Sequence, residues 1–230
     1  MFVTDDTIVA IATPPGRGAL GVVRISGPRT IEIAAQMLDR TEPLRPRHAT
    51  LARVRGMSAT ARAFDEAVAT LFTAPHSYTG EHVVEITTHG SPIVLQAVIR
   101  SAQAAGARLA EPGEFTLRAF LNGKRDLIQS EAVADLIDAA TPLQARIAFD
   151  QLEGTLTERI AVIDAALFDL IARLEASLDF PDEGYHFVEP SRAAQDITTV
   201  IEAIEDLLVD ATTGRMIREG ATVVIAGRTM

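Results

Sequence analysis

The sequence has no cysteine and no tryptophan, and only 5% of its 230 residues are aromatic. The lack of cysteine excludes disulfides, thiolate catalysis and cysteine-bound metals, and it suits a cytosolic protein. No apolar run approaches the ~20 residues that a membrane-spanning helix needs. The first 16 residues include acidic side chains and no basic one, unlike a secretory signal peptide. We therefore expect a cytoplasmic protein without a membrane segment.

The residues that are present describe a globular chain, with 47% hydrophobic and 23% charged residues and a net charge of −10. This length suffices for one large domain or two modest ones. Residues 1–120 contain 12 Lys/Arg and 11 Asp/Glu, whereas residues 121–230 contain 9 and 20. The acidic second half repels phosphate backbones, and this charge balance disfavours a direct tRNA-binding domain, an alternative that a steep salt dependence of tRNA binding would revive. The balanced first half has room for a local anion site.

The first half alternates strand-like and helix-like segments. β-branched runs predict strands at Thr7–Ala12, Gly21–Ile25, Thr50–Val54, Ala67–Phe72, Val83–Thr87 and Arg108–Ala110. Helical spacing of apolar residues predicts helices over Arg29–Leu38 and from Ser91-Pro92 onward, with Ser91 as N-cap. The irregular order favours an α+β domain with a mixed sheet over a doubly wound sheet.

From about Glu114 to Gly214 nearly every segment has helical periodicity. Leucine and isoleucine recur every three or four residues from Leu152 to Leu178, which predicts one long helix with an apolar stripe. The stripe breaks at Phe180–Gly184, and a second helix follows Pro190-Ser191. The two helices should pack antiparallel as part of a bundle. Their faces need a third or fourth helix, which nothing else in the chain clearly supplies.

Arg24 and Glu85 are charged residues inside β-branched strands, where a charge facing the core is costly unless it is paired. One interpretation is an exposed face or a simple Arg–Glu ion pair. The other is a ligand site, because a carboxylate can accept two parallel hydrogen bonds from a ring N–H and an adjacent amino group, as on a pterin or guanine edge. Arginine and lysine could hold an anionic part of such a ligand.

Other candidate features are weaker. Asn122-Gly123 predicts a helix end, so Lys124 sits on a corner that is ordinarily just solvated. The five histidines are scattered without metal-site spacing, and we expect no metal centre. Thr222–Ala226 predicts a buried strand, and Gly227 after it is typical either of a plain turn or of the start of a phosphate-binding loop.

Several separated motifs together resemble the N-terminal part of the MnmE/TrmE family of tRNA modification GTPases. The matching motifs are Asp6–Ala10, Thr13–Gly18, Ser77–Glu81, His89-Gly90, Glu111–Thr116, Arg118–Lys124, Ser130–Ile137, Asp179–Glu183 and Val223–Arg228. The resemblance implies an N-terminal folate-binding domain, similar to that of aminomethyltransferases, followed by a helical domain into which a GTPase domain is inserted. We expect boundaries at 1–120 for the folate-binding domain, 121–218 for an incomplete antiparallel helical bundle and 219–230 for the first GTPase strand.

The resemblance also implies function. Members bind 5-formyl- or 5,10-methylene-tetrahydrofolate, form homodimers through the N-terminal domain, and act with the flavin-containing partner MnmG (GidA) on the wobble uridine of tRNA. The family's folate contacts fall on Arg24, Glu85 and Lys124 of this sequence. Glu85 is expected at the pterin edge, and Arg24 and Lys124 are expected to hold the anionic or carbonyl-rich part of the folate. No catalytic residue is assigned.

The sequence departs from the family pattern at Gly227-Arg228, which are not followed by the Gly-Lys-Ser/Thr of a phosphate loop. We therefore expect a fragment that neither binds nor hydrolyses GTP by itself, with GTP, Mg²⁺ and K⁺ used only by the full-length family. The alternative to a folate-binding, dimerising fragment is a non-catalytic helical interaction module with a vestigial folate pocket. Calorimetry with folate separates the two.

Overall fold

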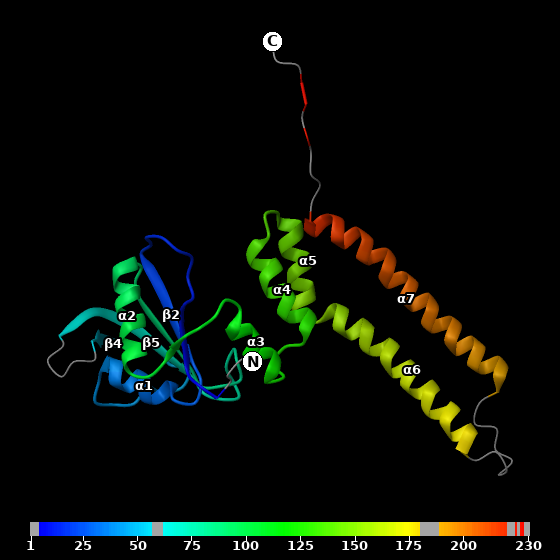
Figure 1. The fold of residues 1–230 in the computed structure, drawn as a ribbon, viewed down its shortest axis with the longest axis horizontal. Coiled ribbons are helices and arrows are strands. Elements are labelled where there is room, and N and C mark those ends of the chain that lie inside the picture. Colours follow the sequence, from blue (N-terminus) through cyan, green and yellow to red (C-terminus); the bar gives the residue numbers. More distant parts are fainter. Residues whose placement is uncertain (1–4, 57–61, 180–188, 220–223, 225, 228–230) are drawn as a thin grey trace. The chain divides into compact units, whose positions relative to one another are not determined.

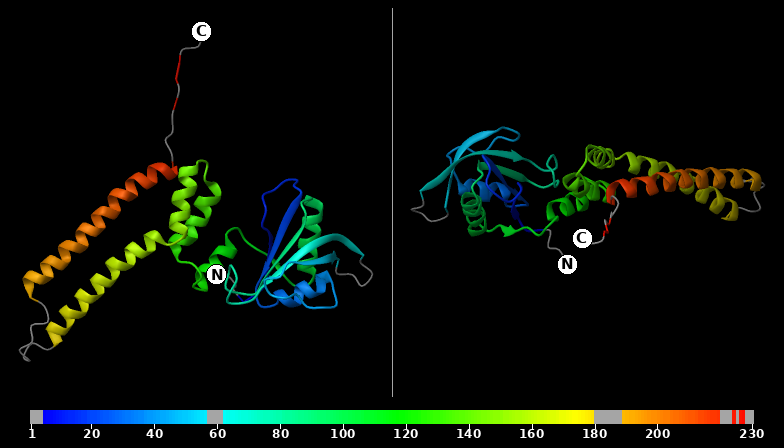
Figure 2. Two further views of the ribbon diagram at one scale, coloured as in Figure 1. Left: turned by 180° about the vertical axis from the view of Figure 1, so that it is seen from behind. Right: turned by 90° about the horizontal axis from the view of Figure 1, so that it is seen from above.

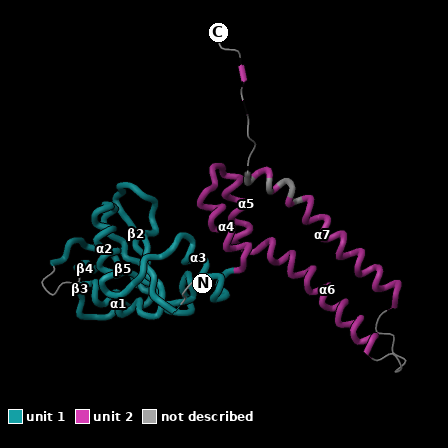
Figure 3. The backbone as a smooth tube through the Cα atoms, in the orientation of Figure 1, with its two compact units in different colours: residues 1–125 teal, residues 126–230 magenta. Residues whose placement is uncertain are grey.

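The computed structural model describes residues 5–56, 62–179, 189–219, 224 and 226–227. It divides into two compact units, residues 1–125 and residues 126–230 (Figure 3). The first unit combines strands and helices, and the second consists of helices. The predicted α+β class is confirmed.

A seven-stranded sheet organises the first unit. Its strands are β1 (Ile8–Ile11), β2 (Leu20–Ser26), β3 (Leu38–Asp39), β4 (Thr50–Arg55), β5 (Ala63–Phe72), β6 (Val83–His89) and β7 (Arg108–Leu109). They lie in the order β3-β4-β5-β6-β2-β1-β7. Every neighbouring pair is antiparallel except β1 and β7, which run parallel, so the sheet is mixed as expected.

Three helices complete this unit: α1 (Thr30–Met37), α2 (Pro92–Ala104) and α3 (Glu114–Leu121) (Figure 1). Apolar residues of α1 and α2 form one core cluster with the inward residues of the central strands, including Val23, Ile25 and Ile86. Since side chains alternate along a strand, Arg24 and Glu85 face the other side of the sheet. The half-buried face that carries them is thus separated from the core.

The predicted strands and helices of this unit are present, with shifted ends. β5 begins at Ala63, four residues earlier than expected, and the two-residue β3 was not predicted because it is too short to show alternation. Ser91 occupies the N-cap position of α2 and Pro92 its first turn, although the Ser91 side chain makes no capping hydrogen bond.

The second unit contains α4 (Leu127–Asp138), α5 (Pro142–Leu152), α6 (Thr155–Asp179) and α7 (Pro190–Glu219) (Figure 1). Capping boxes start α4 and α5, with Asp126 and Gln129 at one and Thr141 and Gln144 at the other. The long helices α6 and α7 run antiparallel, as predicted (Figure 2). The Arg173 guanidinium bonds to the Asp196 carboxylate across them at 2.7 Å.

The prediction of one uninterrupted helical stripe from Leu152 was wrong. Gly154, with a φ of 98°, separates α5 from α6 and places Leu152 in the shorter helix. The chain also supplies the further helices that the sequence did not reveal, since α5 contacts α7 through a hydrogen bond from Gln144 to the Ile217 carbonyl. A cavity of about 660 Å³ lies among α4 to α7.

Much of the apolar surface of α6 and α7 remains exposed all the same. Leu170 and Val200 are buried, but Phe168 is 75% and Leu178 79% exposed. The predicted break at Phe180–Gly184 lies outside the described residues. Of the expected strand Thr222–Ala226 only residues 224 and 226 are described, and neither lies in a strand. No helix among the described residues is long and apolar enough to cross a membrane.

Candidate functional site

Arg24 and Glu85 form an ion pair on the half-buried face of the sheet. They are direct cross-strand partners, Arg24 on β2 and Glu85 on β6. The Arg24 Nε and Nη2 atoms lie 2.9 and 2.7 Å from one carboxylate oxygen, Oε1, and both side chains are about a quarter to a third exposed. The other oxygen, Oε2, has no hydrogen-bond partner among the described residues. This oxygen is therefore available to accept a hydrogen bond from a ligand.

Two aromatic rings border this ion pair. The Arg24 guanidinium carbon lies 4.9 Å from the ring centroid of Tyr78 and 5.7 Å from that of Phe115. Arg125 lies 5.2 Å from the Tyr78 ring, and the Tyr78 hydroxyl hydrogen-bonds the Thr116 hydroxyl at 2.9 Å. Such stacking orients a guanidinium over a ring face. The half-buried site thus combines an acceptor, a donor fork and flat apolar walls, which suits a planar heteroaromatic ligand.

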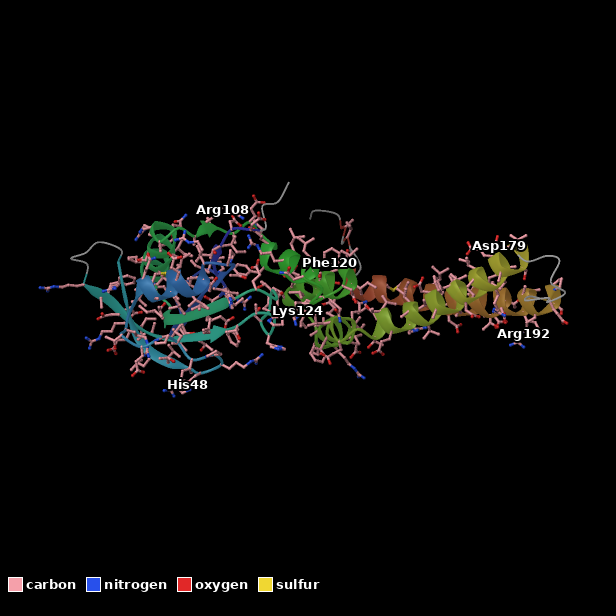
Figure 4. The ribbon with its side chains drawn as sticks, turned by 90° about the horizontal axis from the view of Figure 1, so that it is seen from below. His48, Arg108, Phe120, Lys124, Asp179 and Arg192 are labelled. Carbon is pink, nitrogen blue, oxygen red and sulfur yellow. The ribbon has the colours of Figure 1, made fainter. Side chains whose placement is uncertain are left out.

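Lys124 adjoins the loop that carries Tyr78. Its backbone N–H donates to the Ala119 carbonyl at 2.8 Å just after α3, and its side chain is exposed (Figure 4). Gly80 has a φ of 80°, and a Cβ added there would lie 3.1 Å from the Lys124 Cγ. Asn122 fixes the same loop by donating to the Thr79 carbonyl at 2.7 Å.

The structure therefore brings Arg24 and Glu85 into contact and places Lys124 beside the loop that Arg24 also touches. The ion pair of the first interpretation is present. The ligand-site interpretation of Arg24 and Glu85 stays a prediction. No contact of Lys124 with the pair is recorded among the described residues.

A buried charge network behind the loop was missed by the sequence reasoning. Arg118 is 1% exposed and bonds the carboxylates of Asp6, Glu81 and Glu114, the last at 3.0 Å. Arg108 also reaches Glu114, at 2.7 Å. The i,i+4 spacing of Glu114 and Arg118 gave a signal, but the same spacing describes a surface pair on any helix.

Two carboxylates of this network, Glu114 and Asp6, have lowered pKa values. Burial opposes ionisation of Glu114, but hydrogen bonds from Arg108, the Glu111 amide and Arg118 outweigh it, and the pKa of Glu114 lies below its usual range. A hydrogen bond from Arg108 likewise lowers the pKa of Asp6. Together these charges hold α3 to the start of the chain.

The network also reaches the loop of the candidate site. Ser26 donates from its hydroxyl to the Glu81 carboxylate at 2.6 Å and hydrogen-bonds the Thr79 hydroxyl at 2.7 Å. Arg118 approaches the same Glu81 carboxylate at 3.2 Å. The loop that bears Tyr78 and Gly80 is thus anchored to buried groups, which gives the site a fixed wall.

A second polar pair joins His89, at the end of the strand that carries Glu85, to Asp65 on the neighbouring strand β5. The His89 Nδ1 atom is 2.6 Å from the Asp65 carboxylate, and the His89 backbone N–H also donates to Asp65 at 2.9 Å. The described residues contain no group of three or more His, Asp or Glu side chains that could hold a metal ion.

The fold defines a two-unit protein, an α+β domain that carries a candidate ligand site, followed by a helical domain. The family description "GTP-binding protein TrmE N-terminus" matches residues 7–124, and "MnmE helical domain" matches residues 127–222. The chain belongs to the MnmE/TrmE family.

Three relatives illustrate the similarity, and each is named "tRNA modification GTPase MnmE". The protein of Legionella pneumophila (strain Philadelphia 1) is 46% identical over 97% of this chain and 49% of its own length. That of Azoarcus sp. (strain BH72) is 48% identical over 97% and 48%. That of Nitrosomonas europaea is 45% identical over 98% and 49%. The chain spans about half the length of the curated relatives it matches.

Proposed function

We propose that the first unit binds a tetrahydrofolate derivative, 5-formyl- or 5,10-methylene-tetrahydrofolate, at the site formed by Arg24, Glu85 and Lys124. The observation that supports this proposal is the carboxylate of Glu85, whose Oε2 is unbonded beside the rings of Tyr78 and Phe115. A reduced pterin offers an adjacent ring N–H and amino group, which match a carboxylate edge.

The geometry refines the expected roles. Because Arg24 already contacts Glu85, the pterin end of the ligand meets both side chains, and Arg24 does not hold the opposite end. Lys124 is exposed beyond the Gly80 loop, where an ammonium group can pair with the carboxylates of the folate glutamate tail. The chain's own groups thus bind and orient the ligand, and the folate supplies the one-carbon unit.

In the longer protein this binding serves tRNA modification at the wobble uridine. We place it in a cytoplasmic homodimer formed through the first unit, acting with the flavin-containing partner MnmG (GidA), with tRNA bound by the complex. We assign GTP hydrolysis, with Mg²⁺ and K⁺, to full-length members of the family, and this chain spans about half the length of the relatives it matches.

Isothermal titration of the chain with 5-formyl-tetrahydrofolate tests the proposal. Glu85→Gln keeps the shape but removes the charge, and losing charge-assisted hydrogen bonds worth about 1.5–3 kcal/mol should weaken binding by roughly 10- to 100-fold. Glu66→Gln is the matched control, since Glu66 is an exposed carboxylate on the neighbouring strand β5. Equal affinity of the wild type and Glu85→Gln would exclude this site.

The helical unit supports a second candidate, the non-catalytic interaction module. Its specific observation is the exposed apolar surface of α6 and α7, including Phe168 and Leu178. Absence of folate binding in the titration, together with concentration-dependent association of the chain, would favour this function over the first.

A further inference from the structure

The chain concentrates positive charge in one segment of the first unit. Residues 40–62 contain six of its 21 Lys/Arg residues, all arginine, and a single acidic residue, Glu42. The whole chain carries a net charge of −10, so this segment stands out against its background. The exposed arginines of the segment, which we call the basic edge, are Arg45, Arg47, Arg53, Arg55 and Arg62, and the exposed His48 follows Arg47 in the sequence.

The basic edge lies along one border of the sheet. β3 is the outermost strand and β4 is next to it. Arg53 and Arg55 alternate with the buried residues of β4, so their side chains share one face about 6.6 Å apart. His48 and Arg108 lie on opposite sides of this unit in Figure 4, as expected for residues at the two ends of the strand order.

The turn before β4 fixes part of this surface. Arg47 has a φ of 56°, uncommon for a residue with a side chain. Its N–H donates to the Leu71 carbonyl at 2.7 Å, and its Nη2 donates to the His76 carbonyl at 2.9 Å. The side chains of Arg45 and His48 have no partner among the described residues. The turn therefore presents cations that the first unit itself does not neutralise.

The ion pairs present on the basic edge are weak. Arg53 lies 3.5 Å from Glu66 and Arg55 lies 3.9 Å from Asp39, with every side chain 45–65% exposed. Exposed pairs of this kind contribute little and exchange readily. Phosphate groups can thus replace these carboxylates at small cost.

A hollow beside the basic edge favours nucleic acid over other polyanions. It has a volume of about 290 Å³ and is lined by Arg53, Ala63, Phe64, Asp65 and Glu66. The Phe64 ring is 37% exposed. An exposed aromatic ring next to an arginine is a stacking platform for an unpaired base, which a membrane surface does not offer.

We propose that the basic edge binds the phosphate backbone of tRNA, with an unpaired base against Phe64. The choice of tRNA rests on the proposed function, whereas the polyanion character rests on the arginines alone. The contact positions the RNA and carries little sequence information, because phosphates are the same in every sequence.

Fluorescence anisotropy of labelled tRNA between 50 and 200 mM salt tests this proposal. The variant Arg45→Gln/Arg53→Gln/Arg55→Gln removes three charges from the basic edge. We expect its salt slope to fall by about two to three units and its tRNA affinity to fall at least tenfold at low salt. Arg100→Gln/Arg192→Gln, two exposed arginines outside the edge, should behave as the wild type.

Three results would overturn the proposal: wild-type binding weaker than millimolar, equal losses in the edge and control variants, or an edge effect seen only with anionic lipid vesicles. A change in sedimentation of the edge variant without RNA, with tRNA affinity unchanged, would also overturn it and assign the surface to the acidic helices of a second copy. Folate titration of the edge variant separates the two proposals, since intact folate binding with lost tRNA binding supports the edge. Lost folate binding in the wild type with intact tRNA binding contradicts only the folate site.

Discussion

At the scale of single residues, Arg24 has two tasks that a lysine cannot perform together. It directs two nitrogens to one oxygen of Glu85, and its guanidinium lies near the rings of both Tyr78 and Phe115. A guanidinium is planar and stacks on both rings, whereas an ammonium is a compact point charge. Under the proposed folate binding, the orientation of the Glu85 carboxylate toward a pterin depends on the planar guanidinium of Arg24 and not only on its positive charge.

We expect Arg24→Lys to weaken folate affinity by about tenfold, or ~1.4 kcal/mol, with little change in stability. The loss arises because lysine cannot both orient Glu85 and stack on Tyr78. Isothermal titration measures the folate affinity. The control is Arg29→Lys, because Arg29 is an exposed arginine at the start of α1 that pairs with Glu32. Full affinity in Arg24→Lys would show that charge alone is enough.

Glu114 tests the buried network. Replacing it with glutamine leaves Arg118, 1% exposed, with one ionic partner fewer. Breaking a buried ion pair from one side costs about 3–5 kcal/mol, so we expect Glu114→Gln to lower the free energy of unfolding by that amount in urea denaturation. Glu111→Gln, an exposed neighbour, should change it by less than about 0.5 kcal/mol.

The same carboxylates make the stability of the first unit depend on pH in the acid range. The pKa values of Asp6 and Glu114 are lowered in the folded state from ordinary values of 3.8 and 4.5. Their contribution to stability is present above these ordinary values and is lost as the pH falls through the lowered folded values. Thermal unfolding between pH 7 and pH 3 should show this loss below about pH 4.5. The loss of thermal stability at low pH should be smaller in Glu114→Gln than in the wild type. Identical pH profiles of the two proteins would contradict a contribution of Glu114 to this loss.

At the scale of elements, alternation and helical spacing predicted most of the first unit because its strands each have one buried face. Alternation and helical spacing failed where the shortness of an element or its tertiary context determines the structure. β3 has only two residues, and the stripe across Gly154 keeps its spacing although the helix ends there. The Arg24–Glu85 pair was an open alternative, since strand alternation gives the face of a residue but not its cross-strand partner.

The Arg118 network could not have been predicted from spacing. Its members come from four separate parts of the chain, Asp6, Glu81, Arg108 and the helix α3, and only the tertiary fold brings them together. The family motifs include Asp6, Glu81 and α3 but not Arg108, and they do not reveal that Glu114 and Arg118 are buried. The resemblance assigned Arg24, Glu85 and Lys124 to one site, which stays a prediction, and it did not reveal the contact between Arg24 and Glu85.

The loop between β5 and β6 offers a prediction at this scale. Gly80→Ala places a Cβ 3.0 Å from the Asn122 Cβ and 3.1 Å from the Lys124 Cγ, at a φ of 80° that disfavours a side chain. We expect a loss of about 1–3 kcal/mol in stability and weaker folate binding, because Lys124 must move. Gly123→Ala is the control, since its φ is also positive but nothing lies within 4 Å of an added Cβ. Equal effects of both variants on folate affinity would contradict a role for Lys124 contact.

At the scale of the whole molecule, the two units divide the charge and the apolar surface. The helical unit is acidic and exposes apolar side chains on α6 and α7, while the basic edge and the candidate folate site belong to the first unit. A large exposed apolar surface favours association. The described helices contact one another, but they leave this surface uncovered.

We expect the chain to associate with increasing concentration in analytical ultracentrifugation. Phe168→Gln/Leu178→Gln removes two of its most exposed apolar side chains and should lower the association constant by about tenfold or more, because each such burial contributes roughly 1.5–3 kcal/mol. Val162→Gln replaces another exposed apolar side chain of α6. Comparing its association constant with that of the double variant shows whether the effect depends on which exposed side chain is replaced. Unchanged association in the double variant would place the contact in the first unit.

The most direct test of the folate site is a crystal structure of the chain with bound 5-formyl-tetrahydrofolate. The account predicts the pterin ring beside Tyr78 and Phe115, with its ring N–H and amino group within hydrogen-bond distance of the Glu85 carboxylate and the glutamate tail toward Lys124. A folate found in the cavity among α4 to α7, or one that contacts neither Arg24 nor Glu85, would contradict it.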